Sequence, residues 1–171
     1  TNPGACVLPE VITFTATAIA CGKEVRDSDP ATFTPKHGQI LCVNCGPQCY
    51  TSIQAAVDDA EDGDSIHVCC PDDGVYRENV VINGFHNLAI GTDRGGITYD
   101  CIPVEGCTLM SSTPRTGYGF HITNSSNVRI SGFTIVGYLA GIVAQNSAGL
   151  NIHRNDVELN LIGIAFMGTH E

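Results

Sequence analysis

The sequence contains no tryptophan, few basic residues and no long apolar stretch. Its 8 Lys and Arg residues stand against 18 Asp and Glu residues, which gives a formal net charge of -10. Such an acidic surface repels the phosphates of nucleic acids and anionic lipids. The longest apolar stretch, residues 11–21, is interrupted by threonines and is about half as long as the roughly 20 residues of a membrane helix. We therefore expect a protein that neither binds nucleic acid nor spans a membrane.

Charged residues make up only 15% of the 171-residue chain, whereas hydrophobic residues make up 43% and glycine occurs 19 times. This balance suits strands and turns better than a helical bundle, and it argues against disorder. The length is that of a single domain. We therefore expect one folded body.

Cysteine, in contrast to tryptophan, is abundant. The chain has nine cysteines, which is too many for a reducing compartment unless they bind metal. No basic and apolar leader precedes Thr1, as expected after removal of a signal peptide. We expect a secreted or cell-surface protein in which eight cysteines form disulfides and one stays unpaired. The sequence does not determine which cysteines pair with each other. The disulfide candidates are Cys6, Cys21, Cys42, Cys45, Cys49, Cys69, Cys70, Cys101 and Cys107.

Metal binding is the alternative use of these cysteines. Cys42, Cys45 and Cys49 lie close together, and Cys69 and Cys70 follow. This is enough sulfur for zinc or an iron–sulfur cluster. Because thiolate sites usually occur in reducing compartments, we favour disulfides and assign no metal site.

Calcium binding is suggested by an acidic run that begins at Asp58. An EF-hand loop starting there fails, because its third and twelfth positions are Ala60 and Cys69. Asp72 and Asp73 could form a looser calcium site, but a solvated turn is the simpler interpretation. We therefore expect no cofactor.

The first 50 residues contain an alternating run at 11–20, which predicts a strand, and then a polar, loop-like segment at 23–37. A helix is predicted over residues 52–60, where Thr51 and Gln54 fit an N-terminal capping box. The apolar residues of this helix recur at spacings of three and four, at Ile53, Ala56, Val57 and Ala60.

The later part of the chain repeats itself. The sequence numbers of Gly119, Gly141 and Gly163 increase by 22 each time, and apolar positions recur at the same interval. One coil should therefore contain about 22 residues, and the chain from Ile66 onward has room for about five coils.

An earlier copy of the repeat lies upstream, where Ile82 matches Ile122 at an interval of 40. Forty is not twice 22. We therefore expect an irregular coil between the two copies, where Cys101 and Cys107 bound a loop.

Strands as short as those in each copy cannot bury their own apolar faces, but stacking them at the roughly 4.8 Å sheet spacing builds a continuous core. The sequence thus predicts an all-β protein, a right-handed parallel β-helix with a short N-terminal capping helix. Residues 1–50 would form a cysteine-containing extension and residues 51–171 the β-helix. Arg129 should point outward. Inward ladders are expected from Ile122, Val128, Ile130, Ala144, Leu150 and Ile152.

Asn124 has two possible roles. It lies one coil before Asn146, so the two could stack as an inward asparagine ladder. It also begins the glycosylation sequon Asn124-Ser125-Ser126. An inward side chain is inaccessible to a transferase, so we favour the ladder for a bacterial source and leave glycosylation open for other sources.

Residues 50–60 read Tyr-Thr-Ser-Ile-Gln-Ala-Ala-Val-Asp-Asp-Ala, residues 63–68 Gly-Asp-Ser-Ile-His-Val and residues 74–80 Gly-Val-Tyr-Arg-Glu-Asn-Val. This pattern resembles the start of pectin-lyase-like right-handed β-helices, including the pectin methylesterases. The resemblance implies that the helix caps the N-terminal end of the coil. The superfamily acts on acidic polysaccharides as lyases, hydrolases, esterases and epimerases. The catalytic segments of the methylesterases and of the polygalacturonase-like hydrolases do not occur here, so the resemblance implies the fold and not the activity.

Weak candidates for catalysis lie in the last coils. An acid, a base and an arginine on neighbouring coils could act on a uronate. Residues of these types include Arg154 and Glu158, and the four candidates are His121, Arg129, His153 and Asp156. Stacking at the repeat interval places no carboxylate beside His121 or Arg129, so a solvated outer face is the favoured interpretation.

Two classes of function follow. The first is a non-catalytic extracellular protein, either a structural or self-assembling surface component or a glycan-binding module. The second is a polysaccharide-active enzyme with an unfamiliar site. The absence of familiar catalytic motifs favours the first class.

Self-assembly is expected from the last repeat, which starts at Gly163 and is followed by only eight residues. Stacked repeats need a polar cap, because an open coil presents unpaired backbone groups and an apolar cross-section to water. Three explanations compete: the chain is a fragment of a longer β-helix, residues 1–45 of the same chain cover the end, or another molecule covers it. Under the third, residues 11–20 of a neighbouring copy could pair with this end by strand addition, and a leftover cysteine could lock the contact. Such a head-to-tail contact predicts a homo-oligomer or filament.

Overall fold

The computed structural model describes residues 17–20, 23–26, 38–92 and 107–168. The chain divides into two compact units, and residues 17–26 belong to the smaller one. There β1 (Thr17–Ala20) pairs antiparallel with β2 (Lys23–Arg26). The strand predicted over residues 11–20 is therefore present at Thr17–Ala20, while the loop predicted from residue 23 is wrong at Lys23–Arg26. That segment pairs its backbone with β1 although three of its four residues are of charged types.

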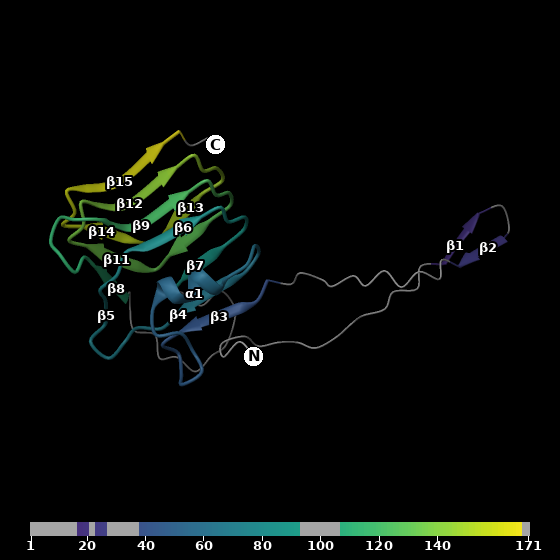
Figure 1. Cartoon of the computed structure of the whole chain (residues 1–171), viewed down its shortest axis with the longest axis horizontal. Helices are drawn as coiled ribbons and strands as arrows, with labels where there is room; N and C mark the ends of the chain where they lie inside the picture. Colours follow the sequence, from purple (N-terminus) through teal and green to yellow (C-terminus); the bar gives the residue numbers. More distant parts are fainter. Residues whose placement is uncertain (1–16, 21–22, 27–37, 93–106, 169–171) are drawn as a thin grey trace. The chain divides into compact units, whose positions relative to one another are not determined.

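The larger unit is a stack of coils, whose strands form three parallel β-sheets that run along the stack (Figure 1). Sheet 1 contains β3 (Ile40–Val43), β4 (Ser65–Val68), β7 (Ala89–Gly91), β10 (Arg129–Ser131) and β13 (Asn151–His153). Sheet 2 contains β5 (Val75–Tyr76), β8 (Cys107–Met110), β11 (Phe133–Val136) and β14 (Asp156–Glu158). Sheet 3 contains β6 (Val80–Asn83), β9 (Tyr118–Thr123), β12 (Ala140–Gln145) and β15 (Ile162–Met167).

From β4 onward, strands that follow one another along the chain lie in different sheets, whereas neighbours within a sheet lie one coil apart. This is a parallel β-helix of about five coils, as the sequence predicts. The first strand of sheet 1, β3, precedes the boundary expected at residue 51, so the β-helix includes residues from Ile40 onward.

The repeat interval of 22 is confirmed in the last coils, where Ile130 pairs with Ile152 and Ile142 with Ile164. The described strands show no separate coil between the two copies, and the irregularity expected there is one of length. Ile82 pairs directly with Ile122, so the longer interval of 40 spans a single coil. Strand pairing fixes the positions of strands but not the length of the corners between them. The extra residues therefore lie between the strands of this coil and not within them. The loop expected between Cys101 and Cys107 falls largely outside the described residues.

Aliphatic ladders fill the interior of the β-helix. Four of the predicted inward residues are fully buried, namely Ile122, Val128, Ile130 and Ala144. Leu150 and Ile152 pack against the same core but are only half-buried, because they belong to the last described coil. Arg129 is exposed, as predicted.

The corners of the coils need left-handed backbone at recurring positions. One such position is occupied by Gly84, Asn124, Asn146 and Gly168, whose φ angles lie between 48° and 78°. Glycine and asparagine tolerate this conformation better than other residues. The chain therefore turns at the same point in successive coils.

The inward asparagine ladder predicted at Asn124 and Asn146 is wrong, since both side chains are exposed. Asn124 instead stacks on the outside, where its Nδ2 donates to Oδ1 of Asn83 at 2.9 Å. The buried residues at this corner are serines, and the backbone N–H of Ser125 donates to Oγ of Ser147 at 3.2 Å. Burial therefore does not oppose glycosylation of Asn124, which stays a prediction.

The helix α1 (Ile53–Asp59) begins one residue later than predicted. Its N-cap is Ser52, whose Oγ accepts from the backbone N–H of Ala55 at 3.1 Å, so the capping box predicted at Thr51 is wrong. The carboxylate of Glu78 completes the cap by accepting from the N–H groups of the first two helical residues, both at 2.9 Å. A capping motif is recognised from neighbouring residues only. It therefore could not predict that Glu78, which is 25 and 24 residues away in sequence from these two donors, would also cap the helix.

Packing of α1 places it at the N-terminal end of the β-helix. The helix contacts β3, β4 and β6, and it buries the apolar residues Ile53, Ala56 and Val57. This end of the core is therefore covered, as the resemblance to pectin-lyase-like β-helices implied.

Candidate functional site

The most chemically distinctive group in the described chain lies where β3 meets the turn that follows it. A disulfide between Cys42 and Cys49 closes this turn. Two backbone hydrogen bonds of 2.8 Å support it, one from Asn44 N–H to the carbonyl of Tyr50 and one from Tyr50 N–H to the carbonyl of Cys42. The turn is therefore held in place by its backbone as well as by sulfur.

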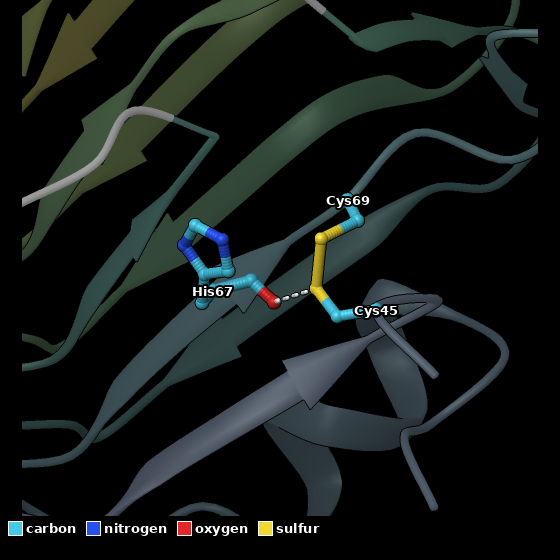
Figure 2. A group of neighbouring side chains, drawn as sticks. All are labelled: Cys45, His67 and Cys69. Atoms are coloured by element: carbon cyan, nitrogen blue, oxygen red, sulfur yellow. Dashed lines mark hydrogen bonds between the residues drawn. A yellow bond between two sulfur atoms is a disulfide. The ribbon is translucent and has the colours of Figure 1, made fainter. Parts of the chain in front are cut away.

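A second disulfide, between Cys45 and Cys69, ties this turn to the end of β4. The imidazole of His67, on the outer face of β4, lies beside it (Figure 2). The two sulfurs and one ring nitrogen of His67 all lie within 4.8 Å of one another, and all three residues are half-buried. We call Cys45, His67 and Cys69 the sulfur–imidazole cluster.

Backbone carbonyls surround the Cys45 sulfur as well. Its Sγ lies 3.3 Å from the carbonyl oxygen of Val43 and 3.7 Å from that of His67. The second contact is the dashed line in Figure 2. A disulfide sulfur has no proton to donate, but a thiol at this position would have two acceptors within reach.

A third disulfide joins Cys70 to Cys107 on β8, one coil later. Disulfide bonding is thus confirmed for six of the candidates, whereas Cys6, Cys21 and Cys101 lie outside the described residues. The expectation that one cysteine stays unpaired therefore remains a prediction.

One hint of the cluster is present in the sequence. His67 and Cys69 alternate along a strand, which places them on the same face. The approach of Cys45 to that face depends on the pairing of β3 with β4, which joins Cys42 to His67 in register. That pairing follows only once the coils are stacked.

The four candidate catalytic residues do not come together. His121 lies on β9 in sheet 3, where its Nε2 is 3.2 Å from Oε1 of Gln145. Arg129 and His153 lie on neighbouring strands of sheet 1, and Asp156 lies on β14 in sheet 2. Residues of an acid–base site must meet at one substrate, and these belong to three sheets.

The calcium candidate Asp73 already has partners. Its Oδ2 accepts from Arg77 at 2.8 Å and its Oδ1 from the N–H of Val75 at 3.1 Å. The hydrogen bond from Arg77 is the main cause that lowers the pKa of the Asp73 carboxyl below its usual range. A cation bound here would have to compete with the guanidinium group.

Two buried tyrosines stabilise the coils. The hydroxyl of Tyr76 donates to the carbonyl of Cys69 and accepts from Asn44 at 2.9 Å, and burial raises its pKa to about 12. The hydroxyl of Tyr138 donates to the carbonyl of Glu78 at 2.5 Å, and burial raises its pKa as well. Both phenols therefore stay protonated at neutral pH and act as hydrogen-bond donors.

At the opposite end of the β-helix from α1, the last described coil exposes apolar side chains. We call them the terminal coil surface. Within the described residues, β13, β14 and β15 each pair with a strand on one side only, and β15 ends the stack in Figure 1. The terminal coil surface consists of the side chains of Leu159, Leu161, Ile162, Ile164, Phe166 and Met167, which are 42% to 80% exposed.

The part of the chain that the structure describes contains no helix of sufficient length and apolarity to cross a bilayer. Comparison with known proteins found no matching family model, no matching curated protein and no matching solved structure.

Proposed function

We propose that the protein is a non-catalytic, extracellular structural component that associates with further copies of itself through the terminal coil surface. The observation that carries the proposal is the exposure of six large apolar side chains on one coil, whose strands have unpaired edges within the described residues. Exposed apolar surface of this kind usually marks an interaction site.

Strand addition fits this edge for two reasons. The outer edge of β15 offers backbone N–H and C=O groups as a template for another strand. Its side chains Ile164 and Phe166 occupy the positions of Ile142 and Ala144 one coil earlier, and those two residues are fully buried. An added strand would bury Ile164 and Phe166 in the same way.

The two ends of the β-helix are unlike, because α1 covers one of them. A contact that uses the terminal coil surface therefore joins different surfaces of two copies. Such a heterologous contact extends into a filament or a ring. We assign the incoming strand to residues 11–20 of the neighbouring copy, of which Thr17–Ala20 is a strand.

Export is part of this proposal, because three disulfides fit an oxidising environment. The resemblance of residues 50–80 to pectin-lyase-like β-helices supports a polysaccharide as a second partner. We propose no polysaccharide-cleaving activity, since the candidate catalytic residues lie on three different sheets.

The test is the size of the purified chain as a function of concentration, measured by light scattering and electron microscopy. Association should increase with concentration, and deletion of residues 1–22 should abolish it. Phe166→Ser should weaken it roughly tenfold, since burial of this half-exposed side chain is worth about 1.5 kcal/mol.

Val81→Ser is the matched control, because Val81 is 45% exposed but lies on β6, away from the last coil. It should leave association unchanged. A chain that stays a monodisperse monomer at every concentration, with or without residues 1–22, would contradict the proposal.

A further inference from the structure

The sulfur–imidazole cluster combines three groups that bind soft and borderline metal ions. Thiolate sulfur and neutral imidazole are the common ligands of Zn²⁺ in proteins. The Sγ atoms of Cys45 and Cys69 and a ring nitrogen of His67 lie within 4.8 Å of one another. In the oxidised protein the two sulfurs are bonded to each other, and they cannot act as thiolates.

We propose that reduction of the Cys45–Cys69 disulfide converts the sulfur–imidazole cluster into a binding site for Zn²⁺. The two thiolates and the His67 imidazole supply three ligands. Water takes the fourth position, which the half-buried location of the cluster leaves accessible.

The distances suit a tetrahedral ion. Two sulfurs bound to the same zinc at about 2.3 Å lie roughly 3.8 Å apart. The Cα atoms of Cys45 and Cys69 are 5.1 Å apart. Rotation of the two side chains can therefore open the sulfurs to the required separation without displacing the strands.

The backbone around the cluster does not depend on this disulfide. Strands β3 and β4 pair in parallel, and the N–H of Cys69 donates to the carbonyl of Val43 at 2.9 Å. The turn that carries Cys45 keeps its own hydrogen bonds between Asn44, Tyr50 and Cys42. The three ligands therefore remain close together after the sulfur–sulfur bond is broken.

Conversion of the disulfide into the zinc site takes two steps. A dithiol reductant transfers two electrons and two protons to the disulfide, which gives two thiols while the reductant closes its own disulfide. Zn²⁺ then replaces the two thiol protons and accepts the imidazole nitrogen. The tie between the β3 turn and β4 thus persists in both redox states, first as a covalent bond and then through the metal.

The experiment uses the full chain reduced with a phosphine and titrated with Co²⁺ and then Zn²⁺. One equivalent of Co²⁺ should give the strong visible bands of a tetrahedral site with thiolate charge transfer, and Zn²⁺ should remove them. His67→Ala should weaken binding by about 100-fold. His153→Ala, which alters an outward histidine on β13 of the same sheet, is the control and should leave binding unchanged.

Alkylation identifies the sulfurs. Zn²⁺ should protect Cys45 and Cys69 of the reduced chain and leave Cys42 and Cys49 reactive. If Cys42 and Cys49 are protected instead, or if His67→Ala binds as tightly as the unchanged chain, the proposal is wrong.

Zinc content after expression can be measured without reducing the purified chain, so it does not require the reduced chain to stay folded. Zinc supplied during expression in a reducing compartment should co-purify at one equivalent with the unchanged chain, and His67→Ala should carry much less. Absence of zinc in both experiments overturns the proposal.

Discussion

Leu159 combines two unfavourable features at one residue. Its φ angle is 55°, in the left-handed region, and its side chain is 80% exposed. The equivalent residue one coil earlier is Gly137, with a φ of 81°. A branched side chain in this conformation costs about 1 kcal/mol, which glycine avoids.

Leu159→Gly should therefore raise the melting temperature of the isolated chain by about 3 °C. Thermal unfolding followed by circular dichroism checks this. The reverse change at the preceding coil, Gly137→Leu, should lower the melting temperature. A lower melting temperature for Leu159→Gly would show that the leucine makes stabilising contacts in the folded chain.

The repeat pattern gave a wrong prediction for the orientation of Asn124. Recurrence at Asn146 favours an inward Asn124, but a recurring asparagine can equally mark a left-handed corner. The inward position belongs to Ser125, the next residue. A shift of one residue exchanges the two faces, and periodicity alone does not choose between them.

At the scale of the strands, the glycines that recur from coil to coil have a packing role. A Cβ atom built on Gly141 would lie 2.5 Å from Cγ1 of Val157 and 2.8 Å from the carbonyl oxygen of Gly163 in the next coil. Both neighbours belong to the coil stacked on β12, and one of them is backbone. The glycine is needed for close approach of the two coils.

Gly141→Ala should therefore lower the free energy of unfolding by about 1–3 kcal/mol, as overpacking commonly does. Denaturant unfolding at low protein concentration measures this. Gly163→Ala is the matched control, because a Cβ there meets nothing within 4 Å. Equal losses at the two positions would show that close approach between coils is not the reason for the repeat.

The strands of the last coils could be predicted from this repeat, since Gly119, Gly141 and Gly163 fix their spacing. The coil between Ile82 and Ile122 could not, because additional residues between its strands lengthen the repeat interval while the strands stay paired. The pairing of the cysteines could not be predicted from the sequence either. Cys45 meets Cys69 only through the pairing of β3 with β4, which lies outside any local pattern.

At the scale of the whole molecule, the three disulfides found among the described residues differ in how much chain they close. Cys70 and Cys107 are 37 residues apart, whereas Cys42 and Cys49 are separated by 7. A longer closed loop restricts the unfolded chain more strongly. The Cys70–Cys107 bond should therefore contribute more to global stability.

Replacing Cys70 and Cys107 together by serine should lower the free energy of unfolding by about 4 kcal/mol, against about 2 kcal/mol for the same change at Cys42 and Cys49. Denaturant unfolding under non-reducing conditions compares the two variants. The opposite order would show that contacts in the folded turn, and not the length of the closed loop, set the contribution of each disulfide.

The pairing of β7 with β10 shows that regular stacking of the strands does not depend on the length of chain between them. Ile90 pairs with Ile130 as regularly as Ile130 pairs with Ile152, although the first pair encloses much more chain than the second. Regular strand pairing is therefore compatible with very different lengths of chain between paired strands. Natural variants of this protein should differ in length between their strands more than within any strand.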